Sequence, residues 1–166
     1  MQLQTNLKVI SNFAVEYQNE NDQFAQTLLS LDSDKLDAVV SELNDIVTPQ
    51  VDCTSCGNCC KSLMINVSDT EADNVAEHLN IPRKKFDDLY IETSLGGKMI
   101  INTIPCHFLN NNTCTVYEHR FAGCREFPAL HLPQFKDRLF TIFMHYDRCP
   151  IIFNVIEQLK QRIVIS

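Results

Sequence analysis

"CTSCGNCC", residues 53–60, places four of the chain's eight cysteines within eight positions. Cys53, Cys56 and Cys59 follow one another at intervals of three residues, and Cys60 is adjacent to Cys59. Inert core cysteines do not cluster in this way, whereas metal sites bring thiolates together at such spacings. The stretch therefore predicts a fold that is organised around bound metal.

The remaining cysteines are dispersed along the chain, and a total of eight is the number that two four-thiolate sites need. Adjacent side chains of an extended segment point to opposite sides, so Cys59 and Cys60 are expected to serve different sites. The predicted first site consists of Cys53, Cys56, Cys59 and Cys149. The predicted second site consists of Cys60, Cys106, Cys114 and Cys124.

The spacing of the ligands bears on the choice of metal. Three thiolates at x2 intervals, together with the remote pair Cys149-Pro150, match the ligand pattern of bacterial [4Fe–4S] ferredoxins. Zinc ribbons also use Cys-x2-Cys pairs with a glycine in the turn, and Gly57 lies in this loop. The pattern favours an iron–sulfur cluster (4Fe–4S) and leaves zinc as the alternative.

Other polar side chains lie beside the cysteine motifs. His107 and His119 can replace a sulfur ligand or orient one from the next layer. Arg125 is predicted to contribute to cofactor binding, by donating hydrogen bonds to the ligating thiolates or by offsetting their charge. An ion pair of Arg125 with Glu118 or Glu126 is the alternative.

Charge and hydropathy limit which partners and which cellular location are expected for the chain. The chain has 14 basic and 21 acidic side chains, a net charge of -7, which repels a phosphate backbone and argues against nucleic acid as a partner. Its first 20 residues do not form a secretory signal, and no apolar run is long enough to cross a membrane. A cytoplasmic location is expected, where thiols stay reduced and clustered cysteines bind metal.

Residues 1–50 are expected to form a helical extension. An apolar heptad seam is interrupted at Asn21, and a second apolar stripe follows the capping residues 32–34. We expect the two to pack as an antiparallel hairpin, and a coiled-coil homodimer through the first helix is the alternative. The seam consists of Leu3, Leu7, Ile10, Ala14, Tyr17, Phe24 and Leu28, and the stripe of Leu36, Val39, Val40, Leu43, Ile46 and Val47.

Residues 51–166 are expected to form a cysteine-cluster domain of the α+β class. "SDTE" (68–71) is a capping box that starts a helix to about residue 79, and a second helix covers 82–90. "KMIINTI" (98–104) is predicted as a strand paired with "CTVY" (114–117), and "RLFTIFMHY" (138–146) as a further strand. The carboxyl-terminal stretch is predicted as a helix, with its apolar face formed by Ile152, Val155, Ile156, Leu159 and Ile163.

Several motifs in order give the chain a family resemblance. "CTSCGNCC", "PCHFL" (105–109), "CTVYEHR" (114–120) and "CREFP" (124–128), with "TEADNVAEHL" (70–79) between the first two, resemble the CxxCxxCC family, or YkgJ-like zinc- or iron-chelating domain. The resemblance covers about 52–150 and implies a bound zinc ion or iron–sulfur cluster. Phe121 departs from the family pattern, which has proline there. Some relatives are flagellin lysine methylases, but they are longer than this chain.

Three classes of function remain open from the sequence. The first is a metal-binding protein whose metal has a structural or electron-transfer role. The second is an enzyme component, such as a small Fe–S oxidoreductase or a methylase-like subunit, although the chain has no nucleotide-binding glycine loop. The third is a metal-handling protein that delivers zinc or iron to a client. An open coordination position favours the second and third classes over the first.

Overall fold

The computed structural model describes residues 3–164 and divides the chain into two compact units. One unit combines the chain up to Asp52 with the chain from Pro128 onward, and the other runs from Cys53 to Phe127. We predicted a boundary near residue 50 and a single domain from 51 to 166. The structure instead groups residues 128–166 with the amino-terminal helices.

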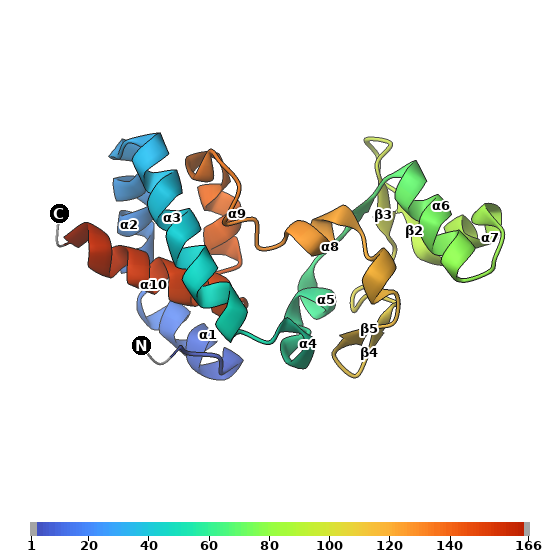
Figure 1. The fold of residues 1–166 in the computed structure, drawn as a ribbon, viewed down its shortest axis with the longest axis horizontal. Coiled ribbons are helices and arrows are strands. Elements are labelled where there is room, and N and C mark those ends of the chain that lie inside the picture. The colour runs from blue at the N-terminus through green and yellow to red at the C-terminus, as the bar shows by residue number, and fades with distance from the viewer. Residues whose placement is uncertain (1–2, 165–166) are drawn as a thin grey trace. The chain divides into compact units, whose positions relative to one another are not determined.

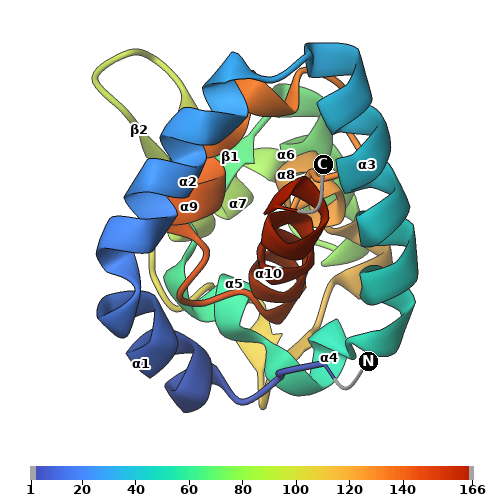
Figure 2. The same ribbon diagram turned by 90° about the vertical axis from the view of Figure 1, so that its left-hand side faces the viewer.

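The helical unit is built around its last helix, α10 (Figures 1 and 2). Four α10 residues, Ile152, Val155, Ile156 and Leu159, are fully buried or nearly so, which confirms the predicted apolar face. The helix packs mainly on α3 and also on α1. The helical elements of this unit are α1 (Leu7–Glu16), α2 (Gln18–Ser30), α3 (Ser33–Val47), η1 (Thr48–Gln50), η3 (Phe135–Arg138), α9 (Leu139–Met144) and α10 (Pro150–Val164).

The apolar stripes of the amino-terminal helices are used within this unit. The seam is divided between α1 and α2, which meet at Tyr17, and its members Ile10, Ala14, Phe24 and Leu28 are buried. The α3 stripe does not pair directly with that seam as the predicted hairpin requires, because α3 packs along α10. The physical reason is that α10 supplies a more apolar face than the Gln- and Asn-rich α2.

The predicted strand over residues 138–146 is wrong, because the segment forms η3 and α9. Its buried residues, Leu139, Ile142 and Tyr146, recur at helical intervals, while Phe140 and Met144 are exposed. Six of the nine residues of the segment are apolar and occur in both alternating sets, so alternation along it does not distinguish a strand from a helix.

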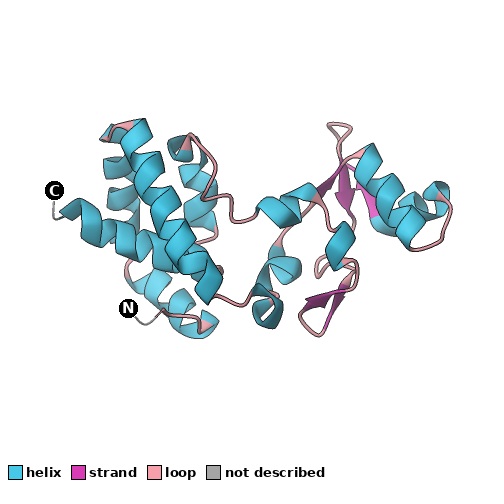
Figure 3. Cartoon of the chain, viewed as in Figure 1, coloured by secondary structure: helices cyan, strands magenta, loops and turns pink. Residues whose placement is uncertain are grey.

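The cysteine unit holds all the strands of the described residues, and each strand is short (Figure 3). Its core contains Val75, Phe86, Ile101, Phe108 and Phe121 among other apolar residues. The elements of this unit are α4 (Cys53–Cys56), α5 (Asn58–Ser62), β1 (Asn66–Val67), α6 (Asp69–His78), α7 (Arg83–Tyr90), β2 (Ile91–Thr93), β3 (Met99–Ile101), β4 (Leu109–Asn110), β5 (Thr113–Cys114), η2 (Tyr117–His119) and α8 (Ala122–Glu126).

Strand pairing differs from the prediction. The strand predicted at 98–104 is present as β3, but its antiparallel neighbours are β1 and β2. The predicted partner, β5, pairs instead with β4, where Asn110 lies opposite Thr113. Asn111 and Asn112 both have positive φ, of 47° and 71°, so they form the kind of two-residue turn that closes a local hairpin.

The predicted helices 69–79 and 82–90 are confirmed as α6 and α7. Ser68 and Glu71 form the expected capping box. Arg83 then joins the two helices, with ion pairs of 2.8 Å each to Asp69, Asp73 and Asp87. Helices and small sheets together give the predicted α+β class. None of the helices among the described residues is long and apolar enough to cross a membrane.

Candidate metal centre

The loop that carries the first four cysteines is shaped by Gly57. Cys53 and Cys56 are the first and last residues of α4, so they lie on one face of a helical turn. Gly57 follows with φ 58°, a conformation that favours glycine, and separates α4 from α5. A Cβ at Gly57 would lie 2.8 Å from both Cα and Cβ of Asn112. Glycine is therefore required by conformation and by space.

The turn of the β4–β5 hairpin holds this loop in place. The side-chain amide of Asn112 donates to the carbonyl oxygen of Ser55 at 3.1 Å, within α4. The ammonium of Lys61, in α5, donates to Oδ1 of the same asparagine. Asn112 thus ties the two short helices of the cysteine loop to the strand that carries Cys114.

Cys59 and Cys60 do not adopt the extended arrangement that we predicted. Both lie in α5, and their sulfur atoms are 3.9 Å apart. Two thiolates bound to one tetrahedral zinc ion at 2.3 Å each are roughly 3.8 Å apart. The spacing of this pair is therefore compatible with one shared ion, and adjacency alone does not assign the two cysteines to different sites.

Cys60 is close enough to three dispersed cysteines to raise their pKa values, and we call Cys60, Cys106, Cys114 and Cys124 the thiol quartet. The backbone N–H of Cys106 donates to the carbonyl of Cys60 at 2.9 Å. Cys114 lies in β5 opposite Leu109, and Cys124 lies in α8. Cys106, Cys114 and Cys124 all pack against the core of the unit, and each quartet member is half-buried with a free thiol.

The quartet members affect one another electrostatically. Burial, followed by the neighbouring thiolates of Cys60, Cys106 and Cys114, raises the pKa of Cys124 to about 12. Burial is also the main cause of the raised pKa values of Cys106 and Cys114, with Cys60 adding to both. For Cys60, the thiol hydrogen bond with Cys59 raises the pKa most, ahead of burial. Ionising these thiols together is unfavourable unless a cation compensates for their charge.

Two basic residues act on the quartet: Lys61 on Cys60, and Arg120 on Cys114 and Cys124. The positive charge of Arg120 opposes the rise of the pKa values of Cys114 and Cys124. The guanidinium carbon lies 3.8 Å from the centre of the Tyr117 ring, and the buried Nε has no hydrogen-bond partner among the described residues. Sequence reasoning missed Arg120, because Arg125 is the arginine next to a cysteine.

Arg125 has other contacts in the structure. It is exposed and donates from Nη1 to the carbonyl oxygen of Arg120. Its charge also acts on Glu71. Burial raises the pKa of that carboxyl, but the N–H donor of Ala122, the capping box and Arg125 together hold it below its usual value. Arg125 thus contacts the segment that carries Arg120, and a direct bond to a thiol stays a prediction.

The two candidate histidines also have partners of their own. A ring nitrogen of His107 lies 2.7 Å from Oδ1 of Asn102, and both residues are exposed. His119 stacks on His78, with ring centroids 4.1 Å apart. The quartet therefore reaches four sulfur donors without either histidine.

Cys149 belongs to the helical unit. It is buried, and it precedes Pro150, the first residue of α10. The other three members of the predicted first site belong to the cysteine unit, so that ligand set stays a prediction. Among residues 3–164, no three or more cysteine, histidine, aspartate or glutamate side chains already stand in the arrangement of metal ligands.

The fold and its thiols define a class of protein, a small α+β unit that gathers cysteines from separate loops. Residues 52–149 match the family model CxxCxxCC, described as "Putative zinc- or iron-chelating domain". The chain belongs to this family. Comparison with curated proteins and with solved structures finds no match.

Proposed function

We propose that the protein binds metal through cysteine thiolates, as zinc or as an iron–sulfur cluster, and that the metal fixes the loops of the cysteine unit. The observation that carries this proposal is the thiol quartet: four half-buried free thiols from α5, β5, α8 and the segment before β4, among which Cys60 raises the pKa values of the other three. Supporting it, the family model describes a zinc- or iron-chelating domain.

The donor set fits this chemistry. Four thiolates are the ligand set of structural zinc sites and of iron–sulfur clusters, and both hold four sulfurs tetrahedrally or near it. When bound, the metal supplies positive charge that favours the ionised thiols. The chain's own contribution is to deliver sulfurs on short, well-anchored elements, with side-chain rotation bringing them to a common centre. Arg120 adds a positive charge beside Cys114 and Cys124.

For the predicted first site, the spacing of Cys53, Cys56 and Cys59 and the Cys149-Pro150 pair support the cluster over zinc. A structural role is our proposal for a zinc form, and electron transfer for a cluster form. The free thiols of the quartet also support a cytoplasmic location, where thiols are kept reduced.

The experiment that tests this proposal is cobalt(II) titration of metal-free protein under reducing, oxygen-free conditions. Cobalt bound by thiolates gives sulfur-to-metal charge-transfer absorption whose intensity increases with the number of sulfur ligands. We expect a four-thiolate spectrum from the native chain. Cys124→Ser is expected to reduce the quartet's share of the charge-transfer intensity by about a quarter, and to weaken binding there, because one of its four thiolates is lost.

Thr113→Ser is the matched control, since Thr113 is exposed and adjacent to Cys114 but has no thiol. Its spectrum should equal that of the native chain. An unchanged cobalt spectrum in Cys124→Ser, in protein whose circular dichroism is native, would remove Cys124 from the ligands. No charge-transfer absorption in the native chain would contradict the proposed function itself.

A further inference from the structure

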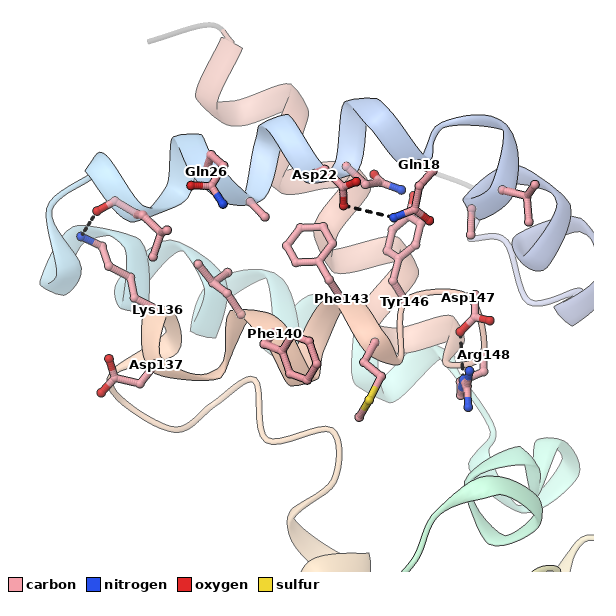
Figure 4. Close-up of a pocket in the computed structure, with 17 residues that line it drawn as sticks. Gln18, Asp22, Gln26, Lys136, Asp137, Phe140, Phe143, Tyr146, Asp147 and Arg148 are labelled. Atoms are coloured by element: carbon pink, nitrogen blue, oxygen red, sulfur yellow. Dashed lines mark hydrogen bonds and ion pairs between the residues drawn. The ribbon is translucent and has the colours of Figure 1, made fainter.

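The helical unit contains a groove that metal binding does not explain (Figure 4). It has a volume of about 700 Å³ and lies between two walls, one formed by α1 and α2, the other by η3, α9 and the residues that follow α9. We call it the α2–α9 groove. Phe143 and Tyr146 extend from the α9 side toward α2 in Figure 4, and Ala14 and Ala25 are among the small residues of the opposite wall.

Large apolar side chains stand exposed along the groove. Phe140 and Met144, one helical turn apart on α9, are 81% and 46% exposed. On the opposite wall Val15 and Leu29 are 76% and 51% exposed. All four line the groove. A contiguous apolar surface of this kind, rimmed by polar residues, is typical of an interaction site.

The dimensions and walls of the groove suit a helix. The wall formed by α2 is 13 residues long, which corresponds to about 20 Å of helix, or roughly four turns. Apolar residues are presented from two helical walls, as in grooves that receive the apolar face of an amphipathic helix. The predicted coiled-coil surface is not this face, since Ile10, Phe24 and Leu28 of the seam are buried within the unit.

The charges of the lining select the chemistry of the occupant. The lining has three carboxylates and two basic groups, and Arg148 pairs with Asp147 at 2.9 Å. The ammonium of Lys136 keeps its charge, but it is directed to the carbonyl oxygens of Leu29 and Leu31 at the end of α2. Asp22, on α2, accepts only from the neutral amide of Gln18, at 3.1 Å. Among the described residues neither Asp22 nor Asp137 on the opposite wall forms an ion pair, so each wall offers a carboxylate, and the lining as a whole has a net charge of -1.

The lining of the groove also contains one buried polar side chain, Asn21. Asn21 lines the groove and is 4% exposed, and its Oδ1 has no hydrogen-bond partner among the described residues. A buried carbonyl oxygen without a donor is unfavourable. Because this oxygen is buried, it is not part of the polar surface that an occupant contacts, and the charges of the two walls decide the chemistry of the occupant.

We propose that the α2–α9 groove docks an amphipathic helix of a partner protein, one with an apolar stripe flanked by lysine or arginine. The apolar stripe covers Phe140, Met144, Val15 and Leu29, and the basic flanks face Asp22 and Asp137. The inference does not depend on metal at the cysteines. It gives the helical unit a role of its own, that of recruiting a client or a larger assembly.

The test uses the full chain and a fluorescein-labelled helical peptide of about 18 residues, with leucines at i, i+3, i+4 and i+7 and lysines on its flanks. A second peptide replaces every lysine with glutamate. Fluorescence anisotropy is expected to show binding of the basic peptide, and at least tenfold weaker binding of the acidic one. Equal affinities would overturn the basic character of the occupant, and no binding of either would overturn the docking site.

Matched variants locate the binding. Phe140→Ser is expected to weaken binding of the basic peptide about tenfold, as for an exposed aromatic anchor, while Ile46→Ser, on α3 outside the groove and 44% exposed, leaves it unchanged. The double variant Asp22→Asn with Asp137→Asn is expected to weaken binding about fivefold, against no change in Asp45→Asn. Equal effects of the groove and control variants would overturn the proposal.

A second copy of the chain is the competing occupant, and light scattering of the unbound protein distinguishes it. The proposal predicts the same mass for the native chain and for Phe140→Ser, because the groove is then open in both. A dimer that is lost in Phe140→Ser would assign the groove to self-association and overturn the partner helix.

Discussion

The cysteine loop needs glycine at position 57 for two reasons, the positive φ and the lack of space for a Cβ. Comparison with two other glycines of the chain separates these two reasons. Gly57 has positive φ, and a Cβ there meets Asn112 at 2.8 Å. Gly97 has positive φ, 76°, but nothing lies within 4 Å of its Cβ position. Gly123 lies in α8 with neither constraint. Alanine at these positions therefore tests conformation and space one at a time.

The expected free energies of unfolding follow from these surroundings. Gly123→Ala should stabilise the protein by about 0.5–1 kcal/mol, because alanine is the better helix former. Gly97→Ala should destabilise it by about 1 kcal/mol, for the left-handed conformation. Gly57→Ala carries that cost and the overlap with the backbone of Asn112, which adds about 1–3 kcal/mol, for a total of roughly 2–4 kcal/mol.

The assay is urea unfolding of the metal-free proteins, followed by metal affinity of each variant. Because the loop carries four cysteines, Gly57→Ala should also weaken metal binding, by about tenfold for each 1.4 kcal/mol lost from the bound arrangement. Gly97→Ala should bind metal like the native chain. If Gly57→Ala is no less stable than Gly97→Ala, the close approach of Asn112 to the loop is refuted.

Three more predictions concern the quartet and its surroundings. Arg120→Gln should weaken metal binding about tenfold, because a positive charge is lost beside Cys114 and Cys124. Arg125→Gln should change the metal affinity less than about threefold. Competition with a chromophoric chelator measures the affinity of each variant. Metal-free protein should lose stability above pH 9, because the pKa of Cys124 is about 12 in the fold against an ordinary value of 9.0. The contribution of the protonated Cys124 thiol to the free energy of unfolding is complete below pH 9 and is lost as the pH rises toward 12. Urea unfolding at several pH values under reducing conditions measures this loss. Glu71→Gln should lower the free energy of unfolding by about 1–2 kcal/mol, because it removes the charged acceptor that joins the capping box to the Ala122 N–H at 2.5 Å. Glu77 is exposed on α6, and Glu77→Gln should leave the free energy of unfolding unchanged in the same urea assay.

Local signals in the sequence were reliable where one interaction decides the structure. The capping box of Ser68 and Glu71 correctly begins α6, and the apolar face of α10 is correct from Ile152 to Leu159. Capping and helical periodicity depend on residues within one or two turns, so they are visible in a single stretch of sequence. The two ligand sets predicted from the eight cysteines stay predictions, because no three or more such side chains among residues 3–164 already stand in the arrangement of metal ligands.

The sequence-based predictions were wrong where tertiary packing decides the local structure. Residues 138–146 have apolar side chains in both alternating sets, so the sequence of the segment does not select a strand or a helix, and packing within the helical unit selects α9. Asn111 and Asn112 close β4 onto β5 through two positive φ angles, which the Asn-rich turn signalled only in part. Nothing in the sequence ranks Arg120 above Arg125 as the neighbour of the thiols, because that depends on how η2 and α8 fold back on the core.

Metal and acid-labile sulfide analysis of the intact protein, purified without oxygen or chelators, tests the central claim most directly. The account predicts stoichiometric metal held by thiolates, and for the favoured cluster form roughly four irons and four sulfides per chain with brown colour. One or two zinc ions per chain without sulfide would retain thiolate metal binding and exclude the cluster. Metal-free protein that takes up neither zinc nor a reconstituted cluster would contradict the account.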